Sequence, residues 1–592
     1  MPFDSSRRLT GANLFFAGCG AVLETEGIEV DAALLAAWRA RLERARTHLG
    51  WYTPGVVARR HAGGVSLAHA APPDQLFVAT EVNEWALCAT LLARDPHHWS
   101  GLEEALIAAA LEAAENPATV IEPVLEERAA LERFARLAAD EARPQLVALL
   151  SEAHARRLPH VLDDTLLTLG AGAGGRDFPL TGLPGPAALP WHELHDIPTA
   201  VITGSNGKTT TVRLLAACAR AHGWRSAYCC TDGVFFDDQL DTAGDYSGPA
   251  GARQVMRERR ARAAVVETAR GGILRRGVAL SQAQVGLVTN VSADHFGEYG
   301  IDDLEGLADV KLSVAALLPD EGLLVLNAED AQLVAKAPTL AQRFGRCPPL
   351  GWFALDADLA LLREHRGRGG VTCGVRAGKL LLNYAGREFN LGAITAMPLT
   401  VEGSATYNVA NLAGAALAAA ALGVPPETIA TVYARFGAQL ADNFGRLMRF
   451  ERAGVRVLVD YAHNPAGLRG LLAVAEHLRG GSGRLGLLLG HAGNRQDAEI
   501  EALAKVAAQF HPALVVVKEN EAHLRGREPG EIPRIIRAAL LRAGLPEARL
   551  PLRMSEVEAA RCALEWAQPG DVLVLPVHSA AARAAVVAIL ED

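Results

Sequence analysis

A glycine-rich stretch near residue 200 carries the residue types that hold a phosphate group. Residues 198–214 read PTAVITGSNGKTTTVRL, in which an apolar run is followed by a glycine turn and then by Lys208. Such a turn between a strand and a helix offers backbone N–H groups and a helix N-terminus to an anion. Lys208 would neutralise the β- and γ-phosphates, and the Thr209 hydroxyl would reach Mg²⁺. We therefore predict that ATP is bound by Gly204, Ser205, Asn206, Gly207, Lys208, Thr209 and Thr210. The loop is shorter than the Walker A pattern, which has four residues between its two glycines.

Polar residues follow two further apolar runs. Glu267 in AAVVETARGG comes at the end of an expected strand, where open α/β sheets place their ligands, and its carboxylate would complete a Mg²⁺ shell. In VGLVTNVSADHFGEYG, Asn290 ends a strand, and Asp294 and His295 follow. Histidine is an unusual Mg²⁺ ligand, so residue type alone makes His295 a capping or core residue. Lys311, taken alone, is an exposed lysine on a helix.

The elements that must position these residues follow from the hydrophobic pattern. From residue 196, the β-branched runs TAVITG, AAVVETA, VGLVTNV and GLLVLNAED alternate with helical patterns, which predicts a doubly wound parallel sheet. Beyond about residue 445, VRVLVDYAHN, RLGLLLGHAG, ALVVVKEN and DVLVLPVHS predict a second, smaller α/β domain. Residues 102–117 and 124–158 have the three- and four-residue apolar spacing of amphipathic helices. Residues 166–195 are rich in Gly and Pro, which predicts a linker.

Length and composition restrict the class of protein. A chain of 592 residues is expected to form about two to four domains. Its net charge of −9, without a basic stripe, argues against a nucleic-acid partner. The eight cysteines have no metal-ligand spacing and fit a reducing cytoplasm. The N-terminal residues lack a signal-peptide core, and apolar runs such as 411–422 are too short to span a bilayer, so we expect a cytoplasmic protein without a membrane partner.

The motifs taken together resemble the Mur ligase family, ATP-dependent enzymes that join amino acids to carboxylates. The resemblance rests on the order T-G-S-N-G-K-T-T, E-T-A-R-G-G, N-x-x-x-D-H and A-D-V-K. Three later motifs agree: the N-x-x-N helix in ATYNVANLAGAALAAA, the G-R pair in DNFGRLMRFE, and D-Y-A-H-N-P in VLVDYAHNPAGLRGLL. The resemblance covers residues 196 to about 590 and implies an α/β Mur-ligase architecture. Its expected parts are an α+β N-terminal domain (1–165), a linker or ATP-grasp remnant (166–195), a central P-loop domain (196–443) and a C-terminal domain (444–592).

The resemblance also implies roles for individual residues. Asn411 would contact the adenine, Asp460 the ribose and Arg446 the phosphates. Thr209 and Glu267 would hold one Mg²⁺. His295 would hold a second Mg²⁺, supported by Lys311 as a carbamate, which turns a cation into an oxygen-donor anion. Catalysis would thus depend on Lys208, Glu267, His295, Lys311, Arg446 and a general base, for which His463, His491 and His578 are the candidates.

Within the family, the chain looks most like the Mur-ligase half of the cyanophycin synthetases. ETARGGILRRG, DYAHNPAG and HLRGREPGEI carry this likeness, and RRLTGANLFF is similar to their N-terminal domain. Residues 152–180 resemble the opening of their ATP-grasp module, but the body of that module does not follow. In those enzymes the ATP-grasp half adds aspartate and the Mur half adds arginine. The resemblance therefore implies one amide-forming step here, with a separate ATP-grasp subunit as a possible partner.

We accordingly expect an ATP-dependent ligase that adds an amino acid to a peptide or polymer carboxylate through an acyl phosphate. Residues 518–531 are the candidate wall for the acceptor amino acid, with Arg525 and Arg527 for its α-carboxylate and Glu519, Glu521 or Glu528 for a basic side chain. Asn494 stands where the relatives tend to have an acidic residue, and the D-N-P-R signature of some cell-wall ligases is absent, so the amino acid stays open. The alternatives are a folylpolyglutamate- or cell-wall-type ligase and a nucleotide-binding regulatory subunit of an ATP-grasp partner. A homo-oligomer is also expected.

Overall fold

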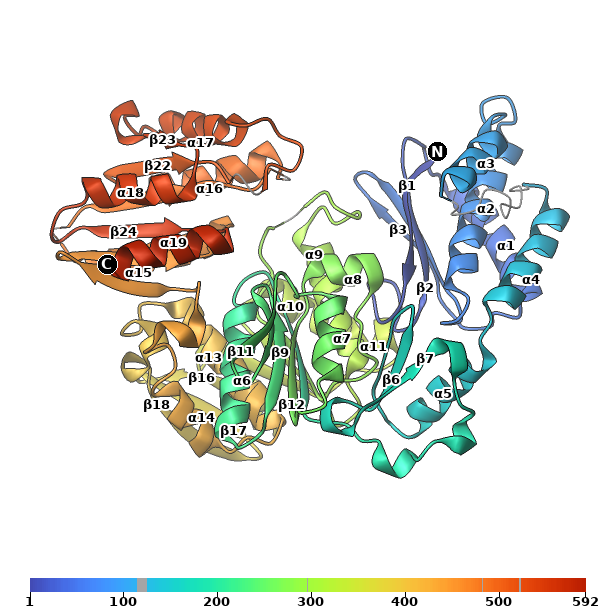
Figure 1. Cartoon of the computed structure of the whole chain (residues 1–592), viewed down its shortest axis with the longest axis horizontal. Helices are drawn as coiled ribbons and strands as arrows, with labels where there is room; N and C mark the ends of the chain where they lie inside the picture. Colours follow the sequence, from blue (N-terminus) through green and yellow to red (C-terminus); the bar gives the residue numbers. More distant parts are fainter. Residues whose placement is uncertain (114–124, 295, 482, 494, 521–522, 592) are drawn as a thin grey trace.

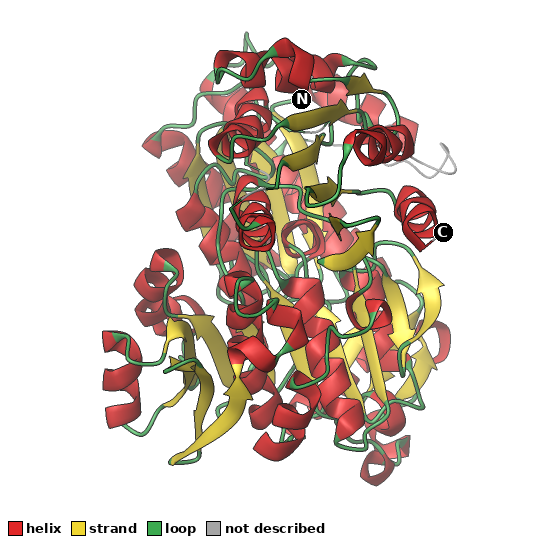
Figure 2. Cartoon of the chain, turned by 90° about the vertical axis from the view of Figure 1, so that its left-hand side faces the viewer, coloured by secondary structure: helices red, strands yellow, loops and turns green. Residues whose placement is uncertain are grey.

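Four β-sheets follow one another along the part of the chain that the structure describes (Figure 1). The computed structural model describes residues 1–113, 125–294, 296–481, 483–493, 495–520 and 523–591. In Figure 1 the N-terminal part (blue) lies on the right and the C-terminal part (red) on the left, with the large central sheet below and between them. Figure 2, which colours helices red and strands yellow, shows helices packed against the faces of the sheets.

The N-terminal part is an antiparallel sheet covered by helices. Its strands have the order β1-β2-β4-β3. They are β1 (Phe3–Leu9), β2 (Gly20–Thr25), β3 (Val56–His61) and β4 (Gly64–Ala70). The helices are α1 (Ala32–His48), α2 (Leu76–Arg94), α3 (Leu102–Ala113), α4 (Glu127–Glu141) and α5 (Pro144–Ala155). The amphipathic pattern over 124–158 thus forms two helices, separated at Pro144, because proline suits the first turn of a helix but not its interior. The end of the pattern predicted over 102–117 lies outside the described residues.

Helix α2 is long and apolar enough, by length and composition, to cross a membrane. In the structure, however, 67% of its most apolar window is buried inside the protein. Trp85 of α2 packs edge-on against Phe134 of α4 at 5.7 Å between ring centroids, and Asn83 accepts a hydrogen bond from Trp38 of α1 at 3.1 Å. Helix α2 is therefore the core helix of the N-terminal part.

The stretch over 166–195, for which composition predicts a linker, is folded. Strands β5 (His160–Leu162), β6 (Leu166–Leu169) and β7 (Arg176–Pro179) form a small antiparallel sheet. Leu167, Leu169 and Phe178 pack against α5 in a core of their own. Arg257 of the central part donates hydrogen bonds to Asp163 at 2.6 Å and to the Thr168 hydroxyl at 2.8 Å, which fix the small sheet to the central part. Gly and Pro here shape tight turns within a packed unit.

The central part confirms the predicted doubly wound sheet. Its eleven strands have the order β11-β10-β9-β12-β8-β13-β14-β15-β16-β17-β18. All pairs from β9 to β16 are parallel, and an antiparallel pair of strands is added at each edge. The strands are β8 (Thr199–Thr203), β9 (Ser226–Cys230), β10 (Gly233–Phe236), β11 (Gln239–Ala243), β12 (Ala263–Glu267), β13 (Val285–Val288), β14 (Leu323–Asn327), β15 (Leu350–Asp356), β16 (Val371–Arg376), β17 (Lys379–Tyr384) and β18 (Arg387–Ala393).

Both faces of this sheet are covered by helices. Alternating strand residues supply two separate cores, with Val201 and Val266 on one face and Ile202 and Val265 on the other. The first face packs against α7 (Pro249–Arg257), α8 (Arg270–Arg276) and α9 (Leu304–Lys311), and the second against α6 (Lys208–Ala221), α13 (Thr406–Ala421) and α14 (Pro426–Tyr433). The remaining helices are α10 (Ala331–Lys336), α11 (Leu340–Phe344) and α12 (Ala360–Gly367). Burial on both faces explains the continuous apolar runs of the parallel strands.

The C-terminal part is the second α/β unit that the sequence predicts. Its strand order is β19-β20-β24-β21-β22-β23, parallel except for β19. The strands are β19 (Met448–Arg452), β20 (Val455–Asp460), β21 (Leu485–Leu489), β22 (Leu514–Lys518), β23 (Leu552–Arg553) and β24 (Val572–Pro576). Helices α15 (Pro465–Arg479), α16 (Asp497–Gln509) and α17 (Glu531–Arg542) cover one face, and α18 (Glu556–Trp566) and α19 (Ala580–Glu591) cover the other.

The N-terminal part packs directly on the segment that leads into α9. Arg59 donates to the carbonyl of Gly300 at 2.5 Å, and the Ala62 N–H donates to Asp302 at 2.7 Å. Arg7 donates to the carbonyl of Leu274 in α8 at 2.9 Å. Since α8 and α9 both contribute to the cavity described next, the N-terminal part supports one side of it.

Candidate active site

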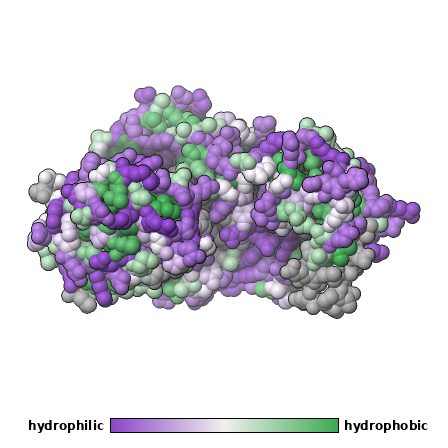
Figure 3. Space-filling view, turned by 90° about the horizontal axis from the view of Figure 1, so that it is seen from above, coloured by the Kyte–Doolittle hydropathy of each residue, from purple (hydrophilic) through white to green (hydrophobic). Residues whose placement is uncertain are grey.

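A cavity of about 980 Å³ lies between the central and C-terminal parts. Seen from above, the surface is hollowed between the left and right halves of the molecule, and mostly hydrophilic side chains surround the hollow (Figure 3). The central part lines the cavity with the loop after β8, with Glu267 at the end of β12, and with residues of α8 and α9. Because β12, β8 and β13 are neighbours in the sheet, their carboxyl ends bring sequence-distant residues together.

The loop after β8 has the geometry of an anion site. Gly204 has a φ of +146° and Gly207 a φ of +84°, both favourable only for glycine. A Cβ on Gly204 would lie 1.8 Å from the Thr289 hydroxyl, and one on Gly207 would lie 2.2 Å from Oδ1 of Asn411. Helix α6 begins at Lys208, so its unpaired N–H groups face the cavity edge. The two glycines are therefore required by close packing as well as by backbone conformation.

The neighbouring strand and the C-terminal part hold this loop in place. Asn290 accepts the Ser205 N–H with its carbonyl at 2.9 Å and the Asn206 N–H with its side chain at 3.0 Å. Asn464, from the C-terminal part, donates to the Asn206 side chain at 2.9 Å. Ser205 and Asn206 thus serve partly to fix the loop, and Asn206 is also a contact between the two parts.

Glu267 is fully buried beside the loop. Its carboxylate accepts the hydroxyl of Thr209 at 2.9 Å and that of Thr231 at 3.1 Å. Burial raises the pKa of this carboxyl, while the charge of Lys208 works in the opposite direction. Carboxylate and hydroxyl oxygens next to a phosphate site are the protein donors that Mg²⁺ takes, together with phosphate oxygens. The donor set of Thr209 and Glu267 therefore fits the magnesium predicted there.

Lys311 corrects one expectation from the sequence. As an isolated helix lysine it was expected to be exposed, but only 3% of it is accessible, and it lines the cavity at the end of α9. Burial holds the pKa of its amine well below the ordinary value, and the charge of Lys208 adds to this effect. A lowered pKa favours the neutral amine, which is the form that carbamylation requires. Asp294 lines the same cavity, whereas His295 lies outside the described residues.

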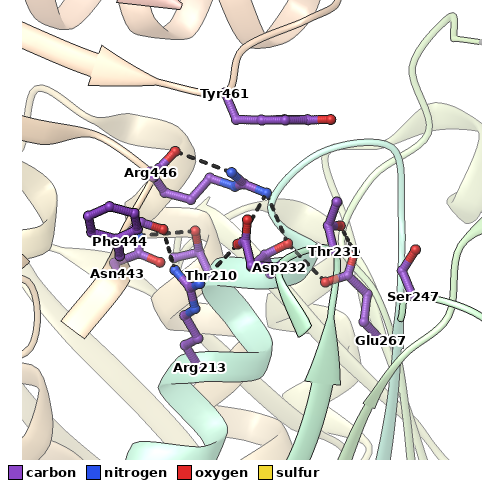
Figure 4. A network of polar contacts seen from close by, with 12 residues as sticks. Thr210, Arg213, Thr231, Asp232, Ser247, Glu267, Asn443, Phe444, Arg446 and Tyr461 are labelled. Carbon is purple, nitrogen blue, oxygen red and sulfur yellow. Dashed lines mark hydrogen bonds and ion pairs between the residues drawn. The ribbon is translucent and has the colours of Figure 1, made fainter. Parts of the chain in front are cut away.

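A cluster of charges at the junction of the two parts is centred on Asp232 (Figure 4). Its carboxylate lies 2.9 Å from Arg213 of α6, 2.9 Å from Arg583 of α19 and 3.9 Å from Arg446. The Arg446 guanidinium lies 4.5 Å from the centre of the Tyr461 ring and donates to the Thr209 hydroxyl at 3.4 Å. Burial favours the neutral acid, but the three guanidiniums outweigh it and lower the pKa of Asp232. Asp232 and Tyr461 together aim Arg446 at the phosphate loop.

The sequence singled out Arg446 of this cluster but not Asp232, Arg213 or Arg583. Asp232 follows the apolar stretch AYCC, so the same rule that singled out Glu267 at a strand end would have marked it. Arg583 lies in an alanine-rich helix 351 residues away, and no local pattern distinguishes it from the other arginines of the chain.

Replacing Asp232 by asparagine is expected to lower turnover strongly. The change keeps the size of the side chain but leaves three guanidiniums without their counter-charge, so Arg446 moves from its position against Thr209. A displacement of about 1 Å of a charge-stabilising group typically costs on the order of 10²-fold in rate. The measurement is kcat for ATP-dependent phosphate release, with Asp241→Asn, an exposed aspartate on β11, as the matched control. Wild-type kcat in Asp232→Asn would show that Arg446 does not depend on this carboxylate.

Neither Asn411 nor Asp460 is among the residues that line the cavity. Asn411 packs against Gly207 and donates to Asn408 at 3.1 Å. Asp460 accepts the N–H groups of Leu447 at 2.6 Å and Ala462 at 2.7 Å. Thr210, in the first turn of α6, accepts from Asn443 at 3.3 Å. The adenine, ribose and phosphate roles of Asn411, Asp460 and Arg446 stay predictions.

The three candidate general bases all line the cavity but differ in their surroundings. His463 keeps 30% of its side chain accessible, and its Nε2 lies 3.6 Å from Asp294. His491 is buried, and burial together with the charge of Arg495 lowers its pKa to about 3. His578 is also buried, and its ring nitrogens face Lys518 and the carbonyl of Ala462. Among the three, the geometry favours His463 as the base.

Only part of the predicted acceptor wall over 518–531 faces the cavity. Arg525 does, together with Asn520 and His523. Arg527 instead pairs with Asp497 at 2.7 Å and Glu531 at 2.6 Å. The acidic residues predicted for the same wall are Glu519, Glu521 and Glu528, and Asn494 is the position where the relatives tend to have an acidic residue. Buried Glu519 accepts the Gly530 N–H at 2.8 Å, Glu528 is exposed away from the cavity, and Glu521 and Asn494 lie outside the described residues.

Comparisons with known proteins find relatives of both parts that line the cavity. The profile of the Mur ligase middle domain matches residues 202–350, and that of the Mur ligase, glutamate ligase domain matches residues 445–576. The chain is 33% identical over 425 residues to the cyanophycin synthetase of Trichormus variabilis (strain ATCC 29413 / PCC 7937), which is 70% of this chain and 46% of the relative. It thus spans about half the length of the cyanophycin synthetases that it matches.

The chain is also similar to two further proteins. The UDP-N-acetylmuramoyl-L-alanyl-D-glutamate--2,6-diaminopimelate ligase of Alkalilimnicola ehrlichii is 30% identical over 386 residues, covering 63% of this chain and 70% of the relative. The solved structure of E. coli FolC in complex with DHPP and ADP covers 67% of this chain and 88% of its own, at 18% identity and a TM-score of 0.48.

Proposed function

The chain belongs to the Mur ligase family, and from this premise we propose that it is an ATP-dependent ligase that joins an amino acid to a peptide or polymer carboxylate. The observation that carries the proposal is the convergence of Lys208, Glu267, Lys311 and His463 on one cavity between the two parts. Lys208, Glu267 and Lys311 come from the central part, and His463 comes from the C-terminal part, so the proposed reaction needs both.

The reaction needs an activated carboxylate, because an oxide is a poor leaving group. Transfer of the γ-phosphoryl group of ATP to the carboxylate gives an acyl phosphate, and the amine then attacks it with loss of phosphate. Phosphoryl transfer depends on positioning and charge neutralisation more than on covalent help from the protein. Lys208 and Arg446 would supply positive charge at the transferring group. Thr209 and Glu267 would hold one Mg²⁺, and His295 with carbamylated Lys311 a second, which would neutralise phosphate charge.

The amine and the acyl phosphate must meet without water. The site is bounded by both parts, and Asn464 and Asp232 bridge them through Asn206 and Arg583. Closure of the C-terminal part would therefore assemble the site and keep water from the acyl phosphate. His463, which lines the cavity from the C-terminal part, would take the proton from the attacking amine.

The finer proposal is a cyanophycin-synthetase-like substrate. The likeness to those enzymes supports a donor carboxylate on an aspartyl side chain and a separate ATP-grasp subunit for the other amide bond. The segment after β22 reads KENEAHLRG, without the D-N-P-R signature, which disfavours a diaminopimelate- or lysine-adding cell-wall ligase. The amino acid itself is left to the assay.

The test is phosphate release by the purified protein with ATP, Mg²⁺ and bicarbonate. Twenty amino acids and ornithine are each paired with polyaspartate and with β-aspartyl peptides, and Lys208→Met serves as the blank. Release that requires one amino acid and one donor supports the ligase and identifies both substrates. Absence of release from every pair, with ADP binding intact, would favour a nucleotide-binding subunit that needs an ATP-grasp partner.

A further inference from the structure

A buried ion pair in the C-terminal part has no role in the reaction described so far. Lys518, the last residue of β22, is fully inaccessible, and Glu556, the first residue of α18, has 4% of its side chain accessible. The ammonium of Lys518 donates directly to the Glu556 carboxylate. A buried pair of this kind is weak as a source of stability, since removing two charges from water costs much of what their attraction returns. We therefore looked for a role of this ion pair other than stabilising the fold.

The ion pair is attached to the turn after β24. The two Glu556 oxygens accept the N–H groups of His578 at 2.9 Å and Ser579 at 2.8 Å. The ammonium of Lys518 also lies 3.4 Å from Nδ1 of the His578 ring. Gly490 makes room for this arrangement, because a Cβ there would lie 2.8 Å from Cγ of Lys518. The pair thus holds both the backbone and the ring of His578.

The partners of the ring determine its tautomer. Nδ1 of His578 lies within hydrogen-bond distance of the Lys518 ammonium, which can only donate, whereas the Glu556 carboxylate is farther away at 3.6 Å. Nδ1 is therefore the accepting nitrogen, and the proton is on Nε2. Nε2 lies 3.2 Å from the carbonyl oxygen of Ala462, which can only accept. Burial and the charge of Lys518 both lower the pKa of the ring well below its ordinary value, which favours a neutral ring. His578 is therefore a neutral donor to Ala462, which leaves it no free nitrogen to serve as a general base.

Ala462 belongs to the segment that carries the reaction residues of the C-terminal part. The Tyr461 ring meets His578 edge-on at 5.4 Å and receives Arg446 on its face. His463 follows and faces Asp294, and Asn464 reaches the phosphate loop through Asn206. We infer that Lys518 and Glu556 are positioning residues, which fix the Nε2–H tautomer of His578 and through it hold residues 461–464 against the central part.

The first test measures the tautomer and the segment without any turnover. In protein labelled with ¹⁵N-histidine, long-range ¹H–¹⁵N correlation should show His578 protonated on Nε2 alone at pH 7.5, assigned by its loss in His578→Gln. A ring protonated on Nδ1, or on both nitrogens, would overturn the inference. Hydrogen exchange of the peptide covering 461–467 should be faster by about tenfold or more in the double variant Lys518→Met/Glu556→Gln. Unchanged exchange there would also overturn it.

The double variant removes both charges together, so that no unpaired charge stays buried, and we expect it to fold. Lys505→Met, an exposed lysine on α16, is its matched control and should exchange as the wild type does. The effect on turnover rests on the proposed function and is measured separately. His578→Leu should lower kcat by about 10²-fold, as expected when a reaction group is misplaced by about 1 Å. His578→Gln, which keeps a donor for Ala462, should recover at least tenfold of that loss.

Equal kcat in His578→Leu and His578→Gln would contradict the positioning role. Failure of the wild type to turn over any substrate pair would count against the ligase proposal alone, because the tautomer and exchange results do not depend on it.

Discussion

Phosphate release by Lys208→Met is expected to fall by about 10³-fold relative to the wild type, while ADP binding weakens far less. Lys208 is the first residue of α6 and lines the cavity. Its ammonium donates to the carbonyl of Ser205 at 3.2 Å, which holds it at the loop after β8. Charge on the transferring phosphoryl group has to be neutralised at the transition state, and the protein contributes there mainly through placed cations. Methionine keeps the length of the side chain and the start of the helix but removes the charge.

The comparison is made on kcat and on the dissociation constant of ADP. Lys379→Met, an exposed lysine on β17, controls for the loss of a positive charge elsewhere on the same sheet. If Lys208→Met keeps more than about a tenth of the wild-type kcat, the loop after β8 does not carry the transferring phosphoryl group, and the proposed site is wrong.

Lys311→Met is expected to lower phosphate release by about 10²-fold or more, and removal of dissolved CO₂ should lower that of the wild type reversibly. The amine of Lys311 is buried near Lys208, Arg270 and Asp294, and burial lowers its pKa, which favours the neutral form that attacks CO₂. The new N–C bond gives a carbamate, and the amine loses a proton to solvent. The product is an oxygen-donor anion, which suits a site predicted to hold Mg²⁺ far better than an ammonium would.

The direct readout is the ¹³C resonance of the carbamate in protein supplied with ¹³C-bicarbonate. The signal should be present in the wild type and absent in Lys311→Met. Lys336→Met is the matched control, because Lys336 lies nearby on α10 but is paired with Glu305 at 2.7 Å and Asp309 at 3.0 Å, which raise its pKa and keep it an ammonium. A spectrum without a Lys311-dependent carbamate, or full activity without CO₂, would refute this role.

Where the residues of a motif are consecutive in the chain, the sequence was sufficient to predict the elements that carry them. The phosphate loop is one continuous stretch, and its strand, its glycines and its helix are fixed by local pattern and backbone conformation. Glu267 could be placed because a strand end is a local feature, and neighbouring parallel strands end at the same edge of the sheet. The seven ordered motifs also gave the family, since each matches over a few consecutive residues.

Local pattern failed where a side chain's neighbours come from distant segments. Lys311 looked like a surface lysine, and only the packing of α9 into the central part buries it. Two of the five residues predicted for the acceptor wall, Arg527 and Glu519, are instead engaged in contacts within the C-terminal part. The Gly- and Pro-rich stretch over 166–195 is folded because apolar residues of α5 cover its small sheet, which composition alone does not reveal.

The sequence by itself determined the two α/β units, the glycine turn between β8 and α6 and the membership of a ligase family, because these depend on hydrophobic period, turn chemistry and short motifs. Only the tertiary structure decided which charges meet: Asp232 with Arg213, Arg446 and Arg583, and Lys518 with Glu556 and His578. The members of these clusters are separated by up to 351 residues. Their energies depend on distance and burial in space, and neither quantity is written in the local order of the residues.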